Sequence, residues 1–431
     1  MRRRLPSKLL FMRSFARWAR DHRHVAAPSP WLWWVLFLVA ASAASFTHAN
    51  ECLPVEGEPF AAELLGVPSG QKLSLLIRHE PTVVPAWEIV LWGRLREPVA
   101  THLVVLVDGG ILAASSVRLL KDTLVFQTES LGVGELPADA VAGMILAIPP
   151  DQARIDQLVD RILKIEAEED RVLLSNGDEL AGQLQEFGST FARLQTPAGV
   201  VEPTATRIQA IILNPLLRQT PNLQAAAESA GGIRGIWVGL LDGSRLWCRQ
   251  LVSEGSGFRL ELVLGSSLVA KPGTIVFLQP IHNRVVYLSD LQPSSFEHRP
   301  FLSVPWSYQS DRNVAGTFLR SGGQIYLKGL GVHSAARLVY TLEEPFERFE
   351  ALIGIDNCTK GQGSVQFAVR VDGHERYRSP IIYGGQKPLP VRVELRGGKR
   401  LELLVDYADR ADQRDLANWL LARLIRPSSE R

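Results

Sequence analysis

Apolar residues occupy every second position in five consecutive stretches of the last third of the chain. A period of two places alternate side chains on opposite faces of a strand, so that one face is buried and the other meets water. Two of the stretches end at the turn pairs Asp372-Gly373 and Gly397-Gly398. Short strands joined by such turns predict an antiparallel β-sandwich over residues 285–428. The alternating positions are Leu338, Tyr340 and Leu342, then Phe349, Ala351, Ile353 and Ile355, then Val365, Phe367, Val369 and Val371, then Leu389, Val391, Val393 and Leu395, and finally Leu401, Leu403 and Val405.

A second pattern occurs three times in the middle of the chain. In each copy an apolar strand leads into an Asp-Gly or Asn-Gly pair, and a second strand follows the pair. Such a pair between apolar strands is a strong hairpin signal, because type I′ turns need positive φ angles. A unit of about 45 residues has little core of its own, so we expect neighbouring units to pack together. The three β repeats are predicted to span residues 100–148, 171–214 and 235–284, with their turn pairs at Asp108-Gly109, Asn176-Gly177 and Asp242-Gly243.

The segments between these units have other patterns. Apolar residues from Ile155 to Leu163 recur at helical spacing, which predicts an amphipathic linking helix within residues 149–170, capped by Asp151. Residues 215–234 are predicted to form a linker, and residues 50–99 have no clear assignment. The predicted fold is therefore mainly β, with repeated small β units followed by a C-terminal sandwich.

The first 49 residues differ in charge from the rest of the chain. They hold eight Lys or Arg side chains and one acidic side chain, whereas the remainder holds 39 basic and 44 acidic side chains. An apolar run from Trp31 to Phe46 follows the basic stretch, and Ala49 precedes the expected cleavage point, as in a secretory signal. The run is about 16 residues long, short of the roughly 20 of a spanning helix, but the long basic stretch also fits an uncleaved signal anchor. Both alternatives imply export to the periplasm, the cell surface or the medium, with membrane attachment only in the second.

The composition after the leader argues against several functional classes. A net charge of −5 gives no electrostatic footprint for nucleic acid. Three widely spaced cysteines cannot form a disulfide framework, and the histidines lack the pairing of a zinc site. The sequence has no nucleophile elbow, phosphate-binding loop or dinucleotide fingerprint. We therefore expect no catalytic residues, no metal and no cofactor.

Four short motifs follow one another in the last third of the chain. They are the run from Lys328 to Ser334 (KGLGVHS), the segments 354–357 (GIDN) and 363–373, and the segment 415–419 (DLANW). Their order and spacing resemble the NPCBM family of carbohydrate-binding modules, which occurs beside glycoside hydrolases of family 98 and is similar to family 51 of the carbohydrate-binding modules. The resemblance implies a galactose-binding-like sandwich that binds glycan, with galactose-containing glycans as the expected partner. It implies no catalytic centre.

The candidate glycan site lies in loops of the predicted sandwich. Trp306 stands in a polar loop, and an aromatic ring offers an apolar face to the C–H groups of a sugar. Loops gather at the two ends of a sandwich, so two further polar loops can converge on this ring. His333 and Trp419 are interpreted as core residues. The candidate ligand-binding residues are Trp306, Asp356, Asn357, Tyr407 and Arg410.

Three functions are compatible with these patterns. The first is an exported, non-catalytic carbohydrate-binding protein. The second is a cell-surface scaffold whose β repeats bind protein partners, and the third is an accessory part of a glycoside hydrolase. Some galactose-binding-like sandwiches hold a structural calcium ion, and Asp356 and Asn357 are the candidate ligands, but they supply too few oxygens to assign a site.

Overall fold

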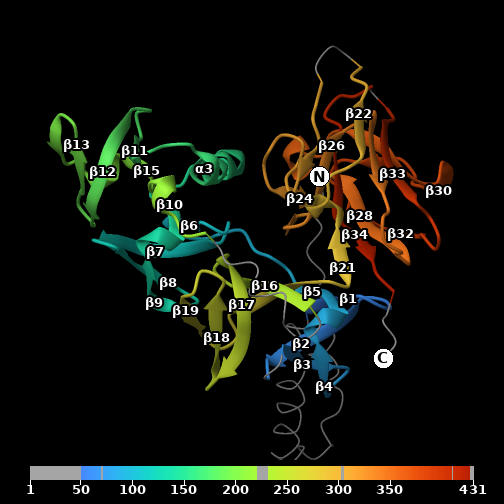
Figure 1. The fold of residues 1–431 in the computed structure, drawn as a ribbon, viewed down its shortest axis with the longest axis horizontal. Helices are drawn as coiled ribbons and strands as arrows, with labels where there is room; N and C mark the ends of the chain where they lie inside the picture. The colour runs from blue at the N-terminus through green and yellow to red at the C-terminus, as the bar shows by residue number, and fades with distance from the viewer. Residues whose placement is uncertain (1–49, 69–70, 221–231, 302–304, 410, 428–431) are drawn as a thin grey trace, which may run out of the picture. The chain divides into compact units, whose positions relative to one another are not determined.

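The computed structural model describes residues 50–68, 71–220, 232–301, 305–409 and 411–427, which belong to one compact unit of the chain. The predicted leader, residues 1–49, lies outside the described residues. The described part is mainly β, with repeated small β units followed by an antiparallel sandwich (Figure 1), so the predicted fold class is confirmed. Over these same residues, no helix combines the length and the apolar character that crossing a membrane requires.

Four small units of five strands each precede the sandwich, one more than the sequence pattern indicated. Unit 1 (residues 50–93) contains β1(Asn50–Pro54), β2(Phe60–Gly66), β3(Lys72–Ile77), β4(Glu80–Pro85), η1(Ala86–Glu88) and β5(Ile89–Gly93). Unit 2 (residues 102–145) contains β6(His102–Leu106), β7(Ile111–Leu120), β8(Thr123–Thr128), β9(Gly132–Pro137), η2(Ala138–Ala140) and β10(Val141–Ile145). Unit 3 (residues 170–212) contains β11(Asp170–Leu174), β12(Glu179–Phe187), β13(Ala192–Thr196), β14(Gly199–Val201), η3(Ala205–Arg207) and β15(Ile208–Ile212). Unit 4 (residues 233–282) contains β16(Ile233–Leu240), β17(Arg245–Glu254), β18(Gly257–Leu262), β19(Ser267–Ala270) and β20(Ile275–His282).

Unit 1 has the same layout as the other three, although residues 50–99 carried no recognisable pattern. Its first turn contains Gly57, which has a φ angle of 96°, but no Asp-Gly or Asn-Gly pair precedes it. Its fourth strand, β4, is mostly exposed to water and therefore lacks a buried alternate face. Without the turn pair and the alternation, unit 1 could not be predicted from the sequence pattern.

The turn pairs of units 2 to 4 form a different turn from the predicted one. Gly109, Gly177 and Gly243 have φ angles of 86°, 94° and 86°, whereas the residues before them do not have positive φ. In unit 2 the Leu106 nitrogen donates to the Gly110 oxygen, and the Gly109 nitrogen donates to the Leu106 oxygen. This three-residue loop, with a left-handed glycine at its last position, is an alternative to the two-residue type I′ turn.

Each unit closes on itself by pairing its first strand with its last. The antiparallel pairs are β1–β5, β6–β10, β11–β15 and β16–β20. The units are also joined to one another by their last strands, since β10 pairs with β15 and β5 pairs with β20. Unit 1 is thus paired with unit 4, and unit 2 with unit 3. One large apolar cluster takes buried side chains from all four units.

The helix α3(Gln152–Lys164) connects units 2 and 3. Asp151 caps it, because the Asp151 side chain accepts a hydrogen bond from the Ala153 nitrogen. The buried face of α3 includes Val159 and Ile162, which pack in an apolar cluster with residues of units 2 and 3. A short η4(Pro215–Leu217) follows unit 3.

The C-terminal sandwich consists of two antiparallel sheets over one apolar core. The first sheet contains β23(Gln309–Ser310), β26(Gly329–His333), β34(Leu416–Ile425), β28(Arg348–Ile355) and β32(Leu389–Glu394), with β21(Val285–Tyr287) paired to β34. The second contains β22(Ser295–His298), β27(Ala336–Thr341), β33(Arg400–Tyr407), β29(Ser364–Val371) and β30(His374–Arg378), with β31(Ile382–Tyr383) paired to β29. The remaining elements are the hairpin of β24(Leu319–Ser321) and β25(Gln324–Tyr326), and the short helices η7(Leu288–Asp290) and η8(Asn357–Thr359). Trp419 is fully buried between the sheets, with its ring 4.9 Å from that of Phe367, as expected for a core residue.

A set of charges, of which Asp156 and Arg320 are largely buried, links the β24–β25 hairpin to the units. The Arg320 guanidinium donates to both oxygens of Asp156 on α3 and to both oxygens of Glu97, which lies between units 1 and 2. The Phe318 nitrogen also donates to Asp156, at 2.9 Å. We call Glu97, Asp156 and Arg320 the charged junction.

Candidate ligand-binding site

The strand pairing brings several connecting loops to one end of the sandwich. Within the second sheet, His298 at the end of β22 pairs with Ala336 at the start of β27, and Tyr407 at the end of β33 pairs with Val365. In the first sheet, His333 at the end of β26 pairs with Leu416 at the start of β34. The loops that follow β22, β26, β28 and β33 therefore leave the sheets at the same end, which we call the loop end.

Trp306 and His333 form an aromatic platform at the loop end. Their ring centroids are 5.4 Å apart and the rings are nearly parallel, with an interplanar angle of 5°. The His298 ring meets His333 edge-on at 5.7 Å, and its Nδ1 atom accepts a hydrogen bond from the Trp306 backbone nitrogen. His333 is 7% exposed and Trp306 is 36% exposed. The buried histidine therefore supports the indole from behind, and part of the indole remains open to a ligand.

Electrostatics at the platform favour neutral imidazoles. Burial lowers the pKa of His298 and of His333 below the ordinary value, and the Asp412 carboxylate opposes that shift in both cases. At neutral pH each ring therefore has one N–H donor and one acceptor nitrogen. Burial also raises the pKa of the neighbouring Asp415 to about 6.

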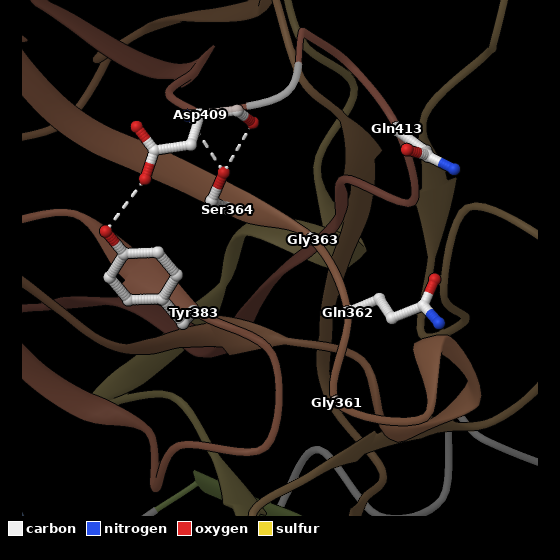
Figure 2. Close-up of a pocket in the computed structure, with 7 residues that line it drawn as sticks. All are labelled: Gly361, Gln362, Gly363, Ser364, Tyr383, Asp409 and Gln413. Carbon is white, nitrogen blue, oxygen red and sulfur yellow. Dashed lines mark hydrogen bonds between the residues drawn. The ribbon is translucent and has the colours of Figure 1, made fainter.

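A polar hollow of about 200 Å³ lies beside the platform at the same loop end. The Tyr383 hydroxyl donates to Asp409 Oδ2 at 2.8 Å. The Ser364 hydroxyl donates to the Asp409 carbonyl oxygen and accepts from the Asp409 nitrogen. Figure 2 shows that Gln362 and Gln413 lie across the hollow from Tyr383 and Asp409. The polar hollow is lined by Gly361, Gln362, Gly363, Ser364, Tyr383, Asp409 and Gln413.

The floor of the hollow depends on a glycine. Gly363 has a φ angle of 90°, and a Cβ atom there would lie 2.3 Å from the Arg414 carbonyl oxygen. Any larger residue would therefore push the 409–415 loop away from β29. This close approach holds Asp409 and Gln413 over the same hollow.

The five residues predicted from the sequence lie in different environments. Trp306 and Tyr407 are exposed at the loop end, and the Tyr407 ring meets Phe301 edge-on at 6.1 Å. Asn357 is exposed on η8. Arg410 lies outside the described residues.

Asp356 differs from the others because its carboxylate is buried and already hydrogen-bonded. It is 1% exposed. Its oxygens accept from the Cys358 nitrogen, the Arg320 nitrogen and the Asn418 side-chain amide. The carboxylate therefore caps η8 and fixes the loop, and these oxygens are not directed to a ligand or to a calcium ion. Within the described ranges, no group of three or more His, Cys, Asp or Glu side chains is placed to hold a metal ion.

Sequence reasoning did not select His298, Tyr383 or Gln413, and it interpreted His333 as a core residue. His333 is buried as expected, but its ring face supports Trp306. One available signal was Tyr383 itself, an aromatic residue that precedes Gly384-Gly385 and so stands at the start of a turn. The roles of His298 and Gln413 depend on loops that are distant in sequence.

Comparison with known proteins identifies the sandwich. Residues 284–425 match the NPCBM/NEW2 domain family. A protein of Renibacterium salmoninarum named "Putative endo-alpha-N-acetylgalactosaminidase" is 34% identical over 110 residues, which are 26% of this chain and 7% of that protein. Alpha-1,3-galactosidase B of Akkermansia muciniphila is 29% identical over 114 residues, which are 26% of this chain and 14% of that protein. The chain therefore spans only a small part of the length of these relatives.

Solved carbohydrate-binding modules of family 51 are also similar to this chain. A module from Clostridium perfringens GH95 in complex with methyl-galactose is 26% identical, with 32% of this chain and 99% of that chain covered and a TM-score of 0.30. A second, from Clostridium perfringens ZmpB in complex with GlcNAc, is 22% identical, with 45% of this chain and 40% of that chain covered and a TM-score of 0.31. The resemblance deduced from the four motifs is thus confirmed by the family match over residues 284–425. The C-terminal third of the chain, residues 284–425, is an NPCBM/NEW2 domain.

Proposed function

We propose that this chain is an exported, non-catalytic carbohydrate-binding protein that binds glycan at the loop end of its C-terminal domain. The observation that carries the proposal is the aromatic platform, a partly exposed indole stacked on a buried imidazole in an NPCBM/NEW2 domain. Because His333 and His298 hold the ring in place before a ligand arrives, little side-chain freedom is lost on binding. An ordered aromatic face beside polar groups is suited to the C–H face and the hydroxyls of a sugar.

Galactose-type sugars are the ligands that we propose to test first. Both similar curated proteins are named for activity on α-linked galactose or N-acetylgalactosamine. Only a fragment of each relative is similar to this chain. We therefore propose that this chain shares their sugar class, and we do not propose that it shares their catalytic activity. A shallow and wet site of this kind is expected to bind with a Kd of roughly micromolar to millimolar.

The test is a glycan array on the full chain, followed by calorimetric titration of the best glycan. Trp306→Ala is expected to lower the affinity about fivefold or more, since stacking is worth about 1 kcal/mol or more. Trp306→Phe is expected to keep part of the affinity. Thermal unfolding of both variants verifies that they are folded. A folded wild-type chain that binds no glycan at millimolar concentration would exclude the proposal. Release of sugar from the bound glycan would contradict the non-catalytic part of the proposal.

A second candidate function is protein binding by the four units. The fourth strand of each unit is paired on one side only among the described residues, and each of these strands has a valine more than half exposed. Unpaired strand edges with apolar side chains can accept another chain. Capture of a protein partner that free sugar does not displace would support this scaffold function. The four valines are Val83, Val133, Val200 and Val269.

Export is proposed from the leader alone. Mass spectrometry of the protein purified from its own cells would locate the N-terminus of the mature chain. Loss of residues 1–49 indicates a cleaved signal, and an intact leader in the membrane fraction indicates an anchor. An intact leader on a soluble cytosolic protein would contradict export.

A further inference from the structure

The aromatic platform and the polar hollow are separated by a single segment of chain. His333 of the platform pairs with Leu416, and the residue before Leu416, Asp415, accepts a hydrogen bond from the nitrogen of Ser364, which lines the hollow. Consecutive Cα atoms are about 3.8 Å apart. The two features are therefore neighbours at one loop end, on either side of the 411–414 turn.

The hollow has hydrogen-bonding groups that the protein itself does not use. The Gln362 and Gln413 side-chain amides have no hydrogen-bond partner among the described residues, and together they offer two N–H₂ groups and two carbonyl oxygens. Across from them, Asp409 is fixed by Tyr383 and Ser364, and its Oδ1 atom accepts no hydrogen bond from the described residues. Hydrogen-bonding groups therefore lie on both sides of the hollow, as a hydroxyl-rich ligand requires.

The size of the hollow limits what can occupy it. Its volume of about 200 Å³ is below the roughly 300–1,000 Å³ of pockets for drug-sized ligands. Backbone at Gly361 and Gly363 forms part of the wall, beside the Tyr383 ring and the polar side chains. A single sugar ring with its hydroxyls matches this size and polarity, and a larger apolar ligand does not.

We propose that the platform and the hollow are two subsites for adjacent sugar residues of one oligosaccharide. The proposal rests on the proposed glycan-binding function and names its ligand class, which is an oligosaccharide of at least two residues. One sugar stacks on Trp306, and the next enters the hollow, where Gln362, Gln413 and Asp409 bind its hydroxyls. Because the second sugar is tethered by the first, its binding is intramolecular and adds to the affinity.

Calorimetric titration of the full-length protein distinguishes the two subsites. The probes are a monosaccharide found on the glycan array and di- and trisaccharides that contain it. The wild type is expected to bind the oligosaccharide about tenfold more tightly than the monosaccharide, since two or three net hydrogen bonds give a gain of that order. Replacement of both amides, Gln362→Ala with Gln413→Ala, is expected to remove this gain, so that the variant binds the oligosaccharide no more tightly than the monosaccharide.

Two further variants serve as references. Trp306→Ala is expected to weaken monosaccharide and oligosaccharide alike. Gln127→Ala, at an exposed glutamine on β8 of unit 2, is the matched control and is expected to change neither. Equal affinity for mono- and oligosaccharide in the wild type would overturn the two-subsite proposal, and so would a double variant that weakens both ligands equally. Either of these two results would leave the proposed glycan-binding function standing. A folded chain that binds no glycan would overturn both the proposed function and this inference.

Discussion

The charged junction and the loop end are both rich in polar side chains, but they differ in whether those side chains have partners. At the junction, the Arg320 guanidinium is bonded to both oxygens of Asp156 and of Glu97. Nearby, the Phe318 ring lies 4.1 Å from the Arg245 guanidinium carbon and 4.2 Å from that of Arg312. At the loop end, by contrast, polar groups line a hollow and face open space.

This difference separates structural from ligand-binding roles. A buried charge that is fully paired holds two parts of the chain together and has nothing left to bind a ligand. An amide at the surface of a hollow keeps its donors and acceptors available. Asp356 belongs with the first group, although its position in a loop had suggested the second.

The largest effect is expected from breaking the charged junction. Asp156→Ala leaves Arg320 without its main partner, and removal of one member of a buried ion pair typically costs about 3–5 kcal/mol. Urea unfolding of the variant and the wild type measures this loss. Asp160→Ala is the matched control on the same helix, since Asp160 pairs with the exposed Lys164 and should cost less than about 1 kcal/mol. Equal stability of the two variants would show that the junction does not stabilise the fold.

A smaller loss of stability is expected from Asp356→Ala. The change leaves the Cys358 nitrogen, the Arg320 nitrogen and the Asn418 amide without their acceptor, which should cost about 2–3 kcal/mol. The folded fraction should retain its glycan affinity, because the carboxylate is buried. Asn357→Ala, at the exposed neighbour, should alter stability little. A stable Asp356→Ala protein with lost glycan binding would instead assign Asp356 to the ligand.

A pH-dependent effect of about 1 kcal/mol is expected at Asp415. Burial raises its pKa in the folded state to about 6, from about 3.9 for an ordinary Asp side chain, so the folded state binds the proton more tightly than the unfolded state. The resulting stabilisation is present below the unfolded pKa and is lost as the pH rises through 6. Between pH 5 and pH 7 the wild type should therefore lose about 1 kcal/mol relative to Asp415→Asn. A stability difference that does not vary with pH would contradict this assignment.

The smallest effect is expected at the margin of the loop end. Tyr407 is 43% exposed and contacts Phe301 edge-on, so Tyr407→Ala should leave stability within about 0.5 kcal/mol of the wild type. If its ring borders the glycan, the affinity should fall about two- to threefold, because the contact is peripheral. Titration of the same glycan with Tyr407→Phe, which keeps the ring, separates loss of the ring from loss of the hydroxyl. An unchanged Kd in Tyr407→Ala would remove Tyr407 from the site.

The sandwich could be predicted because each of its strands has a pattern of apolar and polar residues that is complete within a few positions. Alternation along each strand, as from Phe349 to Ile355, follows from one buried face and can be read within a few residues. The exposed aromatic residue Trp306 was predictable for the same reason, since its polar neighbours mark a loop. Unit 1 was not predicted, because β4 has no buried alternate face and the first turn of the unit has no Asp-Gly pair.

The remaining features depend on residues far apart in sequence. Asp156 and Arg320 are separated by 164 positions. From the sequence around it, Asp156 would be predicted to be a solvated residue on an amphipathic helix. His333 gains its role only when the 305–308 segment places Trp306 on its ring. The burial of a polar side chain is decided by what packs over it, and no local spacing contains that information.

The order in which the four units pair has a consequence for how the chain assembles during synthesis. Units 2 and 3 are neighbours in sequence, so their last strands can pair soon after both have been made. Unit 1 must wait for unit 4, because β5 pairs with β20 through Gly93 and Phe277. At roughly 5–20 residues per second, the intervening chain of about 180 residues takes on the order of 10–40 seconds to appear. During that interval one edge of β5 has no strand paired to it. A chaperone or an export factor that covers this edge would prevent β5 from pairing with a strand of another nascent chain.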